Sequence, residues 1–263
     1  MQEIYDVIVI GGGPAGMMAA GTAASRLIGG QKRPRRVLLL EKNPGLGKKL
    51  LITGGGRCNL TNNKTEVRAM LSKYKGNDQF LFSAFAQFSV KDTLEFFNGR
   101  GLATKEENEG RIFPVSDSAK SVFDVLVKYM KEGKVEVKTG VEVLGVSVGL
   151  DKNIVVETRG GAFSAAACIL ATGGISRPET GSTGEGFKWL KKLGHTVIDN
   201  DFALVPVALQ PGRFPLFPKK GTNRTGMTSW RRISPCRSFS MITKTCESVS
   251  TPNGITNLPP GLS

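Results

Sequence analysis

The feature that most constrains this chain is a glycine-rich turn directly after an apolar strand. Tyr5–Ile10 is a largely apolar run, and Gly11–Gly16 reads Gly-Gly-Gly-Pro-Ala-Gly before a run of small residues typical of a closely packed helix. In this context Gly11 permits the tight turn, Gly13 lets a phosphate approach the backbone, and Gly16 lets helix and strand pack closely. The sequence therefore predicts a phosphate-binding turn between a strand and a helix.

A carboxylate follows at the end of the second predicted strand. Val37–Leu40 is apolar and stops at Glu41, 25 residues after Gly16. A carboxylate at this place in a βαβ unit accepts hydrogen bonds from an adenosine ribose, so a dinucleotide is expected, and an acid there disfavours the 2′-phosphate of NADP. NAD and FAD share the ribose and both remain open. The basic cluster within residues 32–36 is more typical of a solvated loop than of a phosphate site.

A second glycine-rich segment, residues 43–62, predicts an irregular loop built around a ligand. Thr53-Gly54-Gly55-Gly56 lets backbone approach a flat molecule, and Asn59 adds a neutral hydrogen-bonding group. The alternative is a surface turn with a helix cap. Arg57 either contacts an anion or is a solvated surface residue. Cys58 is either a redox thiol or, since no second cysteine is near, a small buried residue, and the second interpretation is favoured.

Residues 66–132 read as mainly helical. The stretch over 80–97 predicts a phenylalanine-rich helix pair that buries its rings. Ser116-Asp117-Ser118 offers the N-cap of a further helix with a clear apolar period, which Gly133 is expected to end.

Residues 134–171 read as four short strands of a β-meander, the last of which runs into Ala171-Thr172-Gly173. A short helix at 187–193 and a strand-like piece at 202–209 follow. The order of glycine turn, acid, glycine loop, meander and Ala-Thr-Gly favours FAD over NAD. The fold class predicted is therefore α/β, a Rossmann-like FAD-binding domain over residues 1–207 with a parallel sheet and a β-meander crossover.

The net charge of +14 is unevenly distributed. Residues 1–210 carry 28 Lys and Arg against 21 Asp and Glu, whereas residues 211–263 carry 8 basic residues against the single acid Glu247. Residues 208–263 are rich in Pro, Ser and Thr, and a composition of this kind does not easily bury a core. They are expected to form an atypical, poorly structured basic tail, which leaves the domain incomplete at its C-terminus. Because basic and aromatic residues do not interleave in the tail, nucleic acid is disfavoured as a partner.

Composition excludes several other classes of protein. The four cysteines show no metal-ligand spacing and only one histidine accompanies them, so neither a metal site nor a disulfide framework is expected. The sequence has no run of about 18 apolar residues, and it enters the first strand without a basic leader. A cytoplasmic protein with no membrane partner is therefore expected. The sequence does not determine the oligomeric state.

The chain resembles the aminoacetone-oxidase-like flavoproteins of bacteria, a family of NAD(P)/FAD-dependent oxidoreductases. Its Thr-Gly-Gly-Gly-Arg-Cys-Asn segment is the most specific part of the resemblance. The segments that carry the resemblance are Tyr5–Gly16, Gly47–Asn62, Glu109–Ser116, Ala171–Gly174, Gly181–Gly186 and Leu193–Val197. The resemblance covers residues 3 to about 207, although members of the family continue further, and a truncated or frameshifted reading frame is the hypothesis for this difference.

The resemblance implies a non-covalently bound FAD, a small-molecule substrate and NAD(P)H as a candidate reductant. Flavin hydride transfer would be the chemistry, and the protein would mainly position the cofactor. The residues expected to bind FAD are Gly11, Gly13, Pro14, Ala15, Gly16, Glu41, Lys42, Thr53, Gly54, Gly55, Arg57, Asn59, Val143, Ala171, Thr172 and Gly173. The catalytic residues are not identified, and Arg57 and Cys58 are the only candidates. The alternative is a non-catalytic, truncated remnant that binds flavin or nucleotide, which leaves open whether this chain is itself an enzyme.

Overall fold

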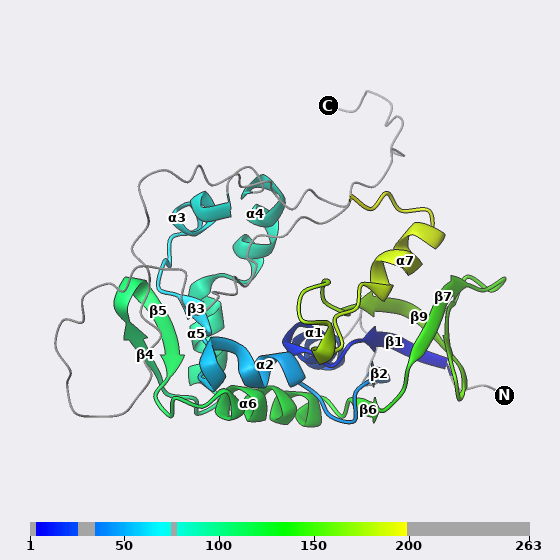
Figure 1. Cartoon of the computed structure of the whole chain (residues 1–263), viewed down its shortest axis with the longest axis horizontal. Coiled ribbons are helices and arrows are strands. Elements are labelled where there is room, and N and C mark those ends of the chain that lie inside the picture. Colours follow the sequence, from blue (N-terminus) through cyan, green and yellow to red (C-terminus); the bar gives the residue numbers. More distant parts are fainter. Residues whose placement is uncertain (1–3, 26–34, 75–77, 199–263) are drawn as a thin grey trace, which may run out of the picture. The chain divides into compact units, whose positions relative to one another are not determined.

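The computed structural model describes residues 4–25, 35–74 and 78–198. Within them, the larger sheet has the strand order β6-β2-β1-β9-β8-β7 (Figure 1). Its strands are β1 (Ile4–Ile10), β2 (Val37–Glu41), β6 (Glu136–Thr139), β7 (Val143–Val148), β8 (Ile154–Thr158) and β9 (Gly161–Leu170). β6, β2, β1 and β9 run parallel, and β8 and β7 continue the sheet in antiparallel pairing. This mainly parallel α/β sheet confirms the predicted fold class.

Most helices of the described residues lie between these strands in the sequence, and α7 follows the last of them. The helices are α1 (Pro14–Ser25), α2 (Lys48–Ile52), α3 (Val67–Leu71), α4 (Asp78–Gln87), α5 (Val90–Asn98), α6 (Ala119–Glu132) and α7 (Glu185–Lys192), together with the 3₁₀ turns η1 (Thr53–Gly56), η2 (Ser72–Tyr74), η3 (Asn108–Gly110) and η4 (Pro178–Thr180). α1 and α6 pack against each other beside the sheet (Figure 1). In α1, Gly21 leaves room for the ring of Tyr129 from α6. None of the helices described is both long enough and apolar enough to cross a bilayer.

β1 and β2 form the buried centre of the larger sheet. Both are nearly continuous apolar runs, as expected for parallel strands that are covered on both faces. Val9 and Leu39 join one hydrophobic cluster with α1 and α6, whereas Ile8 and Leu40 join a second cluster with the meander and Trp189 of α7. The sheet thus lies between two cores.

The predicted four-stranded meander over 134–171 is wrong in its first strand. β6 pairs in parallel with β2, from Leu38 beside Glu136 to Glu41 beside Thr139, and so extends the parallel part of the sheet. The meander consists of β7, β8 and β9. The apolar pattern of a strand does not identify the strand with which it pairs. The sequence therefore could not show that β6 extends the parallel part of the sheet instead of joining the meander.

The predicted helical segment 66–132 contains two strands as well as helices. β4 (Thr104–Glu107) and β5 (Arg111–Pro114) form a second, antiparallel sheet with β3 (Thr61–Asn62), in the order β3-β5-β4. The polar sequence of β4 has no apolar alternation, so it gave no strand signal. The expectation that the residues between α5 and α6 are helical is therefore wrong.

The prediction that residues 80–97 bury their phenylalanines holds for α5 and is wrong for α4. In α5, a capping box of Ser89 and Asp92 starts the helix, and Phe97 is buried. In α4, the side chains of Phe80 and Phe82 are 66% and 48% exposed. Helical spacing predicts an apolar face, but only the tertiary structure shows whether another element covers it.

The ends of the later helices agree with the sequence in part. α6 follows Ser118 and ends at Gly133, whose N–H donates to the carbonyl of Tyr129 at 3.2 Å, but the hydroxyl of Ser118 makes no capping bond. α7 begins at Glu185 instead of residue 187. The strand-like piece at 202–209 and the tail at 208–263 lie outside the described residues.

Candidate nucleotide-binding site

A cavity of about 320 Å³ lies where the carboxyl ends of β1, β2 and β9 meet. Ile10 pairs with Leu40 on one side and with Leu170 on the other, so the residues that follow these three share one edge of the sheet. Ligands of open α/β sheets bind at this edge. The predicted cofactor-binding residues that line the cavity are Gly11, Gly13, Pro14, Ala15, Glu41, Lys42, Val143, Ala171, Thr172 and Gly173.

A second hollow of about 680 Å³ adjoins this cavity. It shares Lys42, Asn43 and Val141 with the first and extends past the turn between β8 and β9, where it is lined by Thr158 and Phe163. The space available to a ligand therefore continues from the carboxyl end of β1, past β2, toward the meander.

Gly11, Gly13 and Gly16 of the turn differ in what surrounds their α-carbons. Gly11 has a φ of 111°, and a Cβ on it would lie 2.8 Å from the carbonyl carbon of Ala171. A Cβ on Gly16 would collide with the carbonyl oxygen of Gly11 and lie 3.0 Å from its carbon. A Cβ on Gly13 would meet no protein atom within 4 Å. Gly13 thus keeps an open cradle at the start of α1, whereas the other two glycines allow close packing of the chain.

Glu41 is 8% exposed and its carboxylate is held by neighbouring donors. The N–H of Gly12 donates to Oε2 at 2.6 Å, and the backbone N–H and side-chain amide of Asn43 donate to Oε1 at 2.8 and 2.7 Å. A carboxylate oxygen accepts more than one hydrogen bond, so Oε2 can accept a further donor such as a ribose hydroxyl. Glu41 is therefore oriented by the turn itself.

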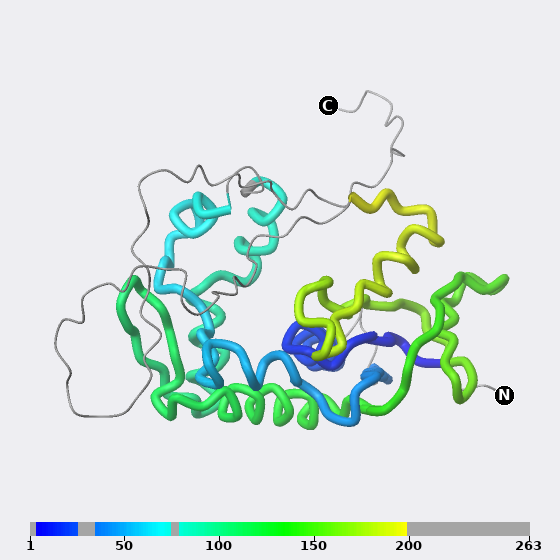
Figure 2. Tube along the Cα trace, viewed as in Figure 1, coloured from blue at the N-terminus to red at the C-terminus, as the bar shows by residue number. Residues whose placement is uncertain are grey.

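The end of β9 brings the Ala-Thr-Gly sequence to the cavity. The N–H of Ala171 donates to the carbonyl of Ile10 at 2.8 Å, which extends the pairing of β9 with β1 to the edge of the sheet. Thr172 and Gly173 then enter a segment, residues 172–185 (Figure 2), that we call the return segment because it brings the chain back to the cavity lined by the start of α1. In the return segment Thr180, Gly181, Ser182 and Glu185 also line the cavity.

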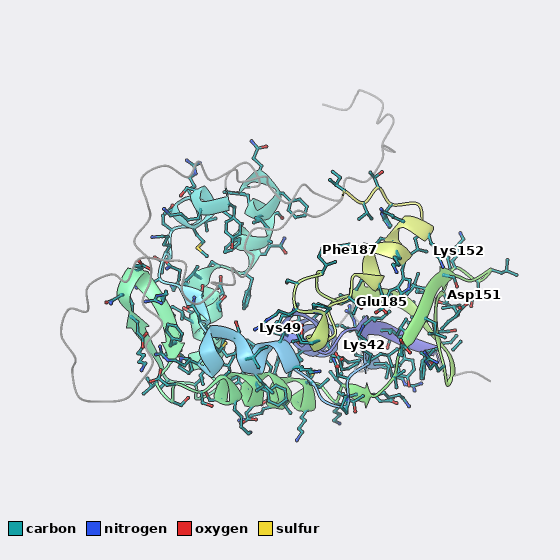
Figure 3. The ribbon with its side chains drawn as sticks, viewed as in Figure 1. Lys42, Lys49, Asp151, Lys152, Glu185 and Phe187 are labelled. Carbon is teal, nitrogen blue, oxygen red and sulfur yellow. The ribbon has the colours of Figure 1, made fainter. Side chains whose placement is uncertain are left out.

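Three lysines hold the return segment in place. Lys42 Nζ donates to Thr183 Oγ1 and Glu185 Oε2, both at 2.8 Å, Lys48 Nζ donates to the carbonyl of Glu179 at 2.6 Å, and Lys49 Nζ donates to the carbonyl of Ser176 and to Ser182 Oγ at 2.9 and 2.7 Å. In Figure 3, Lys42 is labelled near Glu185 at the start of α7, and Lys49 is labelled beside α2, to which it belongs. The hydrogen bond from Lys42 is the main cause that lowers the pKa of Glu185.

The sequence did not identify Lys48 and Lys49 as residues of the site. Both line the cavity because residues 48–52 form the short helix α2, although an irregular loop was expected there. The N–H of Gly47 donates to the carbonyl of Gly12 at 2.9 Å, which ties the start of α2 to the glycine turn. The signal in the sequence was that Lys48 and Lys49 follow Gly47 in the segment 43–62, which was expected to surround a ligand.

The segment from Thr53 to Asn59 does not line this cavity. Thr53, Gly54 and Gly55 belong to η1, and Asn59 lines a different hollow beside β3, together with Tyr74 and Phe85. Gly16, which was also expected to bind the cofactor, acts as a packing residue. Contact of these residues with a cofactor stays a prediction.

The guanidinium of Arg57 is engaged with carboxylates of the protein itself, and its contact with a ligand stays a prediction. Its guanidinium forms ion pairs with Glu107 and Asp117 and lies over the ring of Phe113, 4.2 Å from the ring centre. The hydrogen bond from Arg57 lowers the pKa of Glu107, and hydrogen bonds from Lys105 and then Arg57 lower that of Asp117. Arg57 thus joins η1 to the second sheet and to the start of α6.

Cys58 is buried in the hydrophobic cluster of α1 and α6, in line with the favoured interpretation of a small buried residue. Burial raises the pKa of its thiol, which disfavours the reactive thiolate. Among the described residues no group of His, Cys, Asp and Glu side chains is arranged to hold a metal ion.

The fold and this cavity define a Rossmann-type nucleotide-binding domain. Residues 5–255 match the model of the family described as "HI0933-like protein Rossmann domain", and the chain belongs to this family. The match extends past residue 207, where the resemblance was expected to end.

Two curated relatives cover most of this chain. It is 38% identical over 207 residues to the 3-dehydro-bile acid delta(4,6)-reductase of Clostridium scindens, which covers 78% of this chain and 48% of the relative. It is 34% identical over 208 residues to the ribosomal RNA dihydrouridine synthase of Escherichia coli, which covers 79% of this chain and 49% of that protein. The chain therefore spans about half the length of these relatives.

Among solved structures, the open conformation of a flavocytochrome c3 fumarate reductase is similar to this chain with a TM-score of 0.55. The sequences are 23% identical, and the match covers 74% of this chain and 41% of the other. This similarity supports the fold of the domain.

Proposed function

We propose that the cavity binds FAD and that the chain forms the cofactor-binding part of an FAD-dependent oxidoreductase. The observation that supports this most directly is the open position at Gly13, next to the start of α1 and in the same cavity wall as the end of β9. The N–H groups and positive dipole end of α1 suit a pyrophosphate there. The residues present therefore fit a dinucleotide.

Each part of the dinucleotide has residues of suitable chemistry. Gly13, Pro14 and Ala15 would hold the pyrophosphate, and Glu41 would accept hydrogen bonds from the adenosine ribose. Val143 lines the main cavity and would contact adenine there, and the adjoining hollow beside Val141 and the meander leaves further room for it. When bound, FAD supplies the hydride-transfer chemistry, and the residues named here bind and orient it.

FAD is favoured over NAD by the part of the cavity wall that the end of β9 forms. A β-meander crossover ends in β9, and Ala171, Thr172 and Gly173 line the same cavity as the glycine turn, so a ligand is contacted beyond its adenosine half. The names of the relatives agree with redox chemistry, since one is a reductase and the other forms dihydrouridine, the reduced form of uridine. Glu41 opposes the 2′-phosphate of NADP in this cavity, so NAD(P)H would act from elsewhere as the reductant.

Titration of the purified chain with FAD, NAD and NADP tests the cofactor proposal. We expect flavin absorbance bands in the purified protein or stoichiometric uptake of added FAD, with weaker binding of NAD and NADP. A colourless protein that takes up no added FAD would contradict the proposal. Anaerobic reduction of the bound flavin by NADH or NADPH then tests the reductant.

For the substrate, we propose a small unsaturated or amine-bearing molecule, because a relative reduces a bile acid derivative and because the sequence resembles aminoacetone-oxidase-like proteins. Reoxidation of the reduced flavin by such compounds, compared with reoxidation by oxygen alone, measures this. An RNA substrate is the second candidate, favoured by the rRNA-modifying relative and by the net charge of +14. Salt-dependent binding of ribosomal RNA, followed by nucleoside mass spectrometry for dihydrouridine, distinguishes the two.

A further inference from the structure

Two positive charges at the cavity have no acidic partner in the described part of the chain. Lys48 donates only to the carbonyl of Glu179, and Lys49 donates to a carbonyl and to the hydroxyl of Ser182. Carbonyls and hydroxyls satisfy hydrogen bonds but do not neutralise charge. Both side chains nevertheless line the same cavity as the open glycine position.

Among the other charged residues of the cavity, Lys42 forms an ion pair with Glu185 at 2.8 Å. Glu41 is held only by N–H groups of the glycine turn and of Asn43, which do not neutralise its charge. The described side chains that line the cavity are thus three lysines against two glutamates, and the net positive charge lies at Lys48 and Lys49. The positive dipole end of α1 adds to it, because Gly13, Pro14 and Ala15 line the same space.

The two ammonium groups can bind a further acceptor without releasing the return segment. An ammonium has three N–H donors, and the hydrogen bonds to residues 176–182 leave donors unused on both lysines. A ligand oxygen and the return segment can thus be held at the same time. An acceptor with more than one negative charge, spread over several oxygens, matches two ammonium groups and a helix start.

We propose that Lys48 and Lys49 bind the diphosphate of a dinucleotide and, through the same ammonium groups, close residues 176–182 over it. This inference rests on the proposed function in placing the dinucleotide in this cavity. Because both contacts use the same two side chains, a bound diphosphate makes the return segment harder to open, and a closed return segment strengthens diphosphate binding to the same degree.

Binding of ADP and of adenosine to the full chain tests this proposal. The test variants are Lys48→Met and Lys49→Met, which keep the aliphatic stem, and the corresponding Arg variants, which keep the charge. The control is Lys91→Met on α5. The only described ion pair of Lys91 is a 3.8 Å contact with Glu95. We expect each Met variant to weaken ADP binding by about 10- to 100-fold, the range of a charge-assisted hydrogen bond. Arg should restore most of the affinity, and adenosine binding and the control should not change.

Two further measurements separate charge from a structural role. ADP affinity of the wild type should fall as salt is raised, and this dependence should be weaker in the Met variants. Hydrogen exchange of residues 176–182 should slow on addition of ADP to the wild type but not to the double Met variant. Loss of folding alone would move neither readout in this way.

The outcomes distinguish this inference from the proposed function. If the Met variants bind ADP as the wild type does, or lose adenosine equally, the inference is wrong while FAD binding can still stand. If the wild type binds ADP through the lysines but takes up no FAD, the inference stands and the flavin proposal is wrong. If the wild type binds neither ADP nor FAD, both are wrong.

Discussion

The different surroundings of Gly13 and Gly16 make a test that separates ligand binding from folding. A methyl group at Gly13 meets no protein atom within 4 Å, whereas one at Gly16 must displace the backbone of Gly11 and also lies 3.3 Å from the Cβ of Ala171. Alanine at Gly13 should therefore remove the cradle for the pyrophosphate and leave the fold intact. Alanine at Gly16 should damage the fold.

The expected magnitudes follow from these contacts. Overpacking costs about 1–3 kcal/mol, and Gly16 belongs at the upper end because a backbone carbonyl cannot rotate away as a side chain can. The higher helix propensity of alanine offsets about 1 kcal/mol of this cost. For Gly16→Ala the free energy of unfolding should therefore fall by roughly 2 kcal/mol and Tm by about 4–8 °C. For Gly13→Ala, poorer capping of α1 and reduced freedom of the unfolded chain, each about 1 kcal/mol or less, should nearly cancel.

Thermal unfolding without ligand and titration with FAD measure the two effects. Gly13→Ala should melt within about 3 °C of the wild type and bind FAD at least about 10-fold more weakly, through lost hydrogen bonds to the phosphates. Gly45→Ala is the matched control, because Gly45 also has open space around it but does not line the cavity. The reasoning is refuted if Gly13→Ala binds FAD like the wild type or if Gly16→Ala is as stable as the wild type.

Three other predictions concern single side chains. Glu41→Gln should lower the free energy of unfolding by about 1–3 kcal/mol and weaken ADP binding, because an amide donor then faces buried N–H groups; unchanged melting and ADP titration would contradict this. Arg57 lowers the pKa of Glu107 in the folded protein. The stability that this pair contributes is therefore present above about pH 4 and is lost as the pH falls through the lower folded-state pKa. In urea unfolding, the free energy of unfolding of Arg57→Met should fall less on acidification than that of the wild type. Burial raises the pKa of Cys168 to about 12. Peptide mapping should therefore find Cys168 alkylated slowly at mildly alkaline pH in the folded chain and faster once urea unfolds it. Equal rates of alkylation in the folded and unfolded chain would contradict this prediction.

The adenosine side of the site follows from the sequence because its chemistry is local. The turn from Gly11 to Gly16 and the acid Glu41 act through backbone conformation, a helix start and the end of a strand, which depend on neighbouring residues. The end of β9 at Ala171 was predicted from the order of elements. The structure places all three at one edge of the sheet, as parallel pairing of β1 with β2 and β9 requires.

The partners of long polar side chains could not be read in this way. Arg57 meets Glu107 and Asp117, 50 and 60 residues further along the chain, only because η1, the second sheet and α6 come together. The same holds for Lys48 and Lys49, whose partners in the return segment are about 130 residues away. Ion pairs and hydrogen bonds of this kind leave no periodicity in the sequence.

The sequence by itself thus determined the glycine turn, the acid that follows it and the mainly parallel sheet, since these depend on backbone sterics and on continuous apolar runs. The tertiary structure decided which residues line the cavity: Lys48 and Lys49 do, and Thr53 to Asn59 do not. The physical reason is that a side chain several bonds long reaches whatever the fold brings near it, and the sequence near that side chain does not say what that will be.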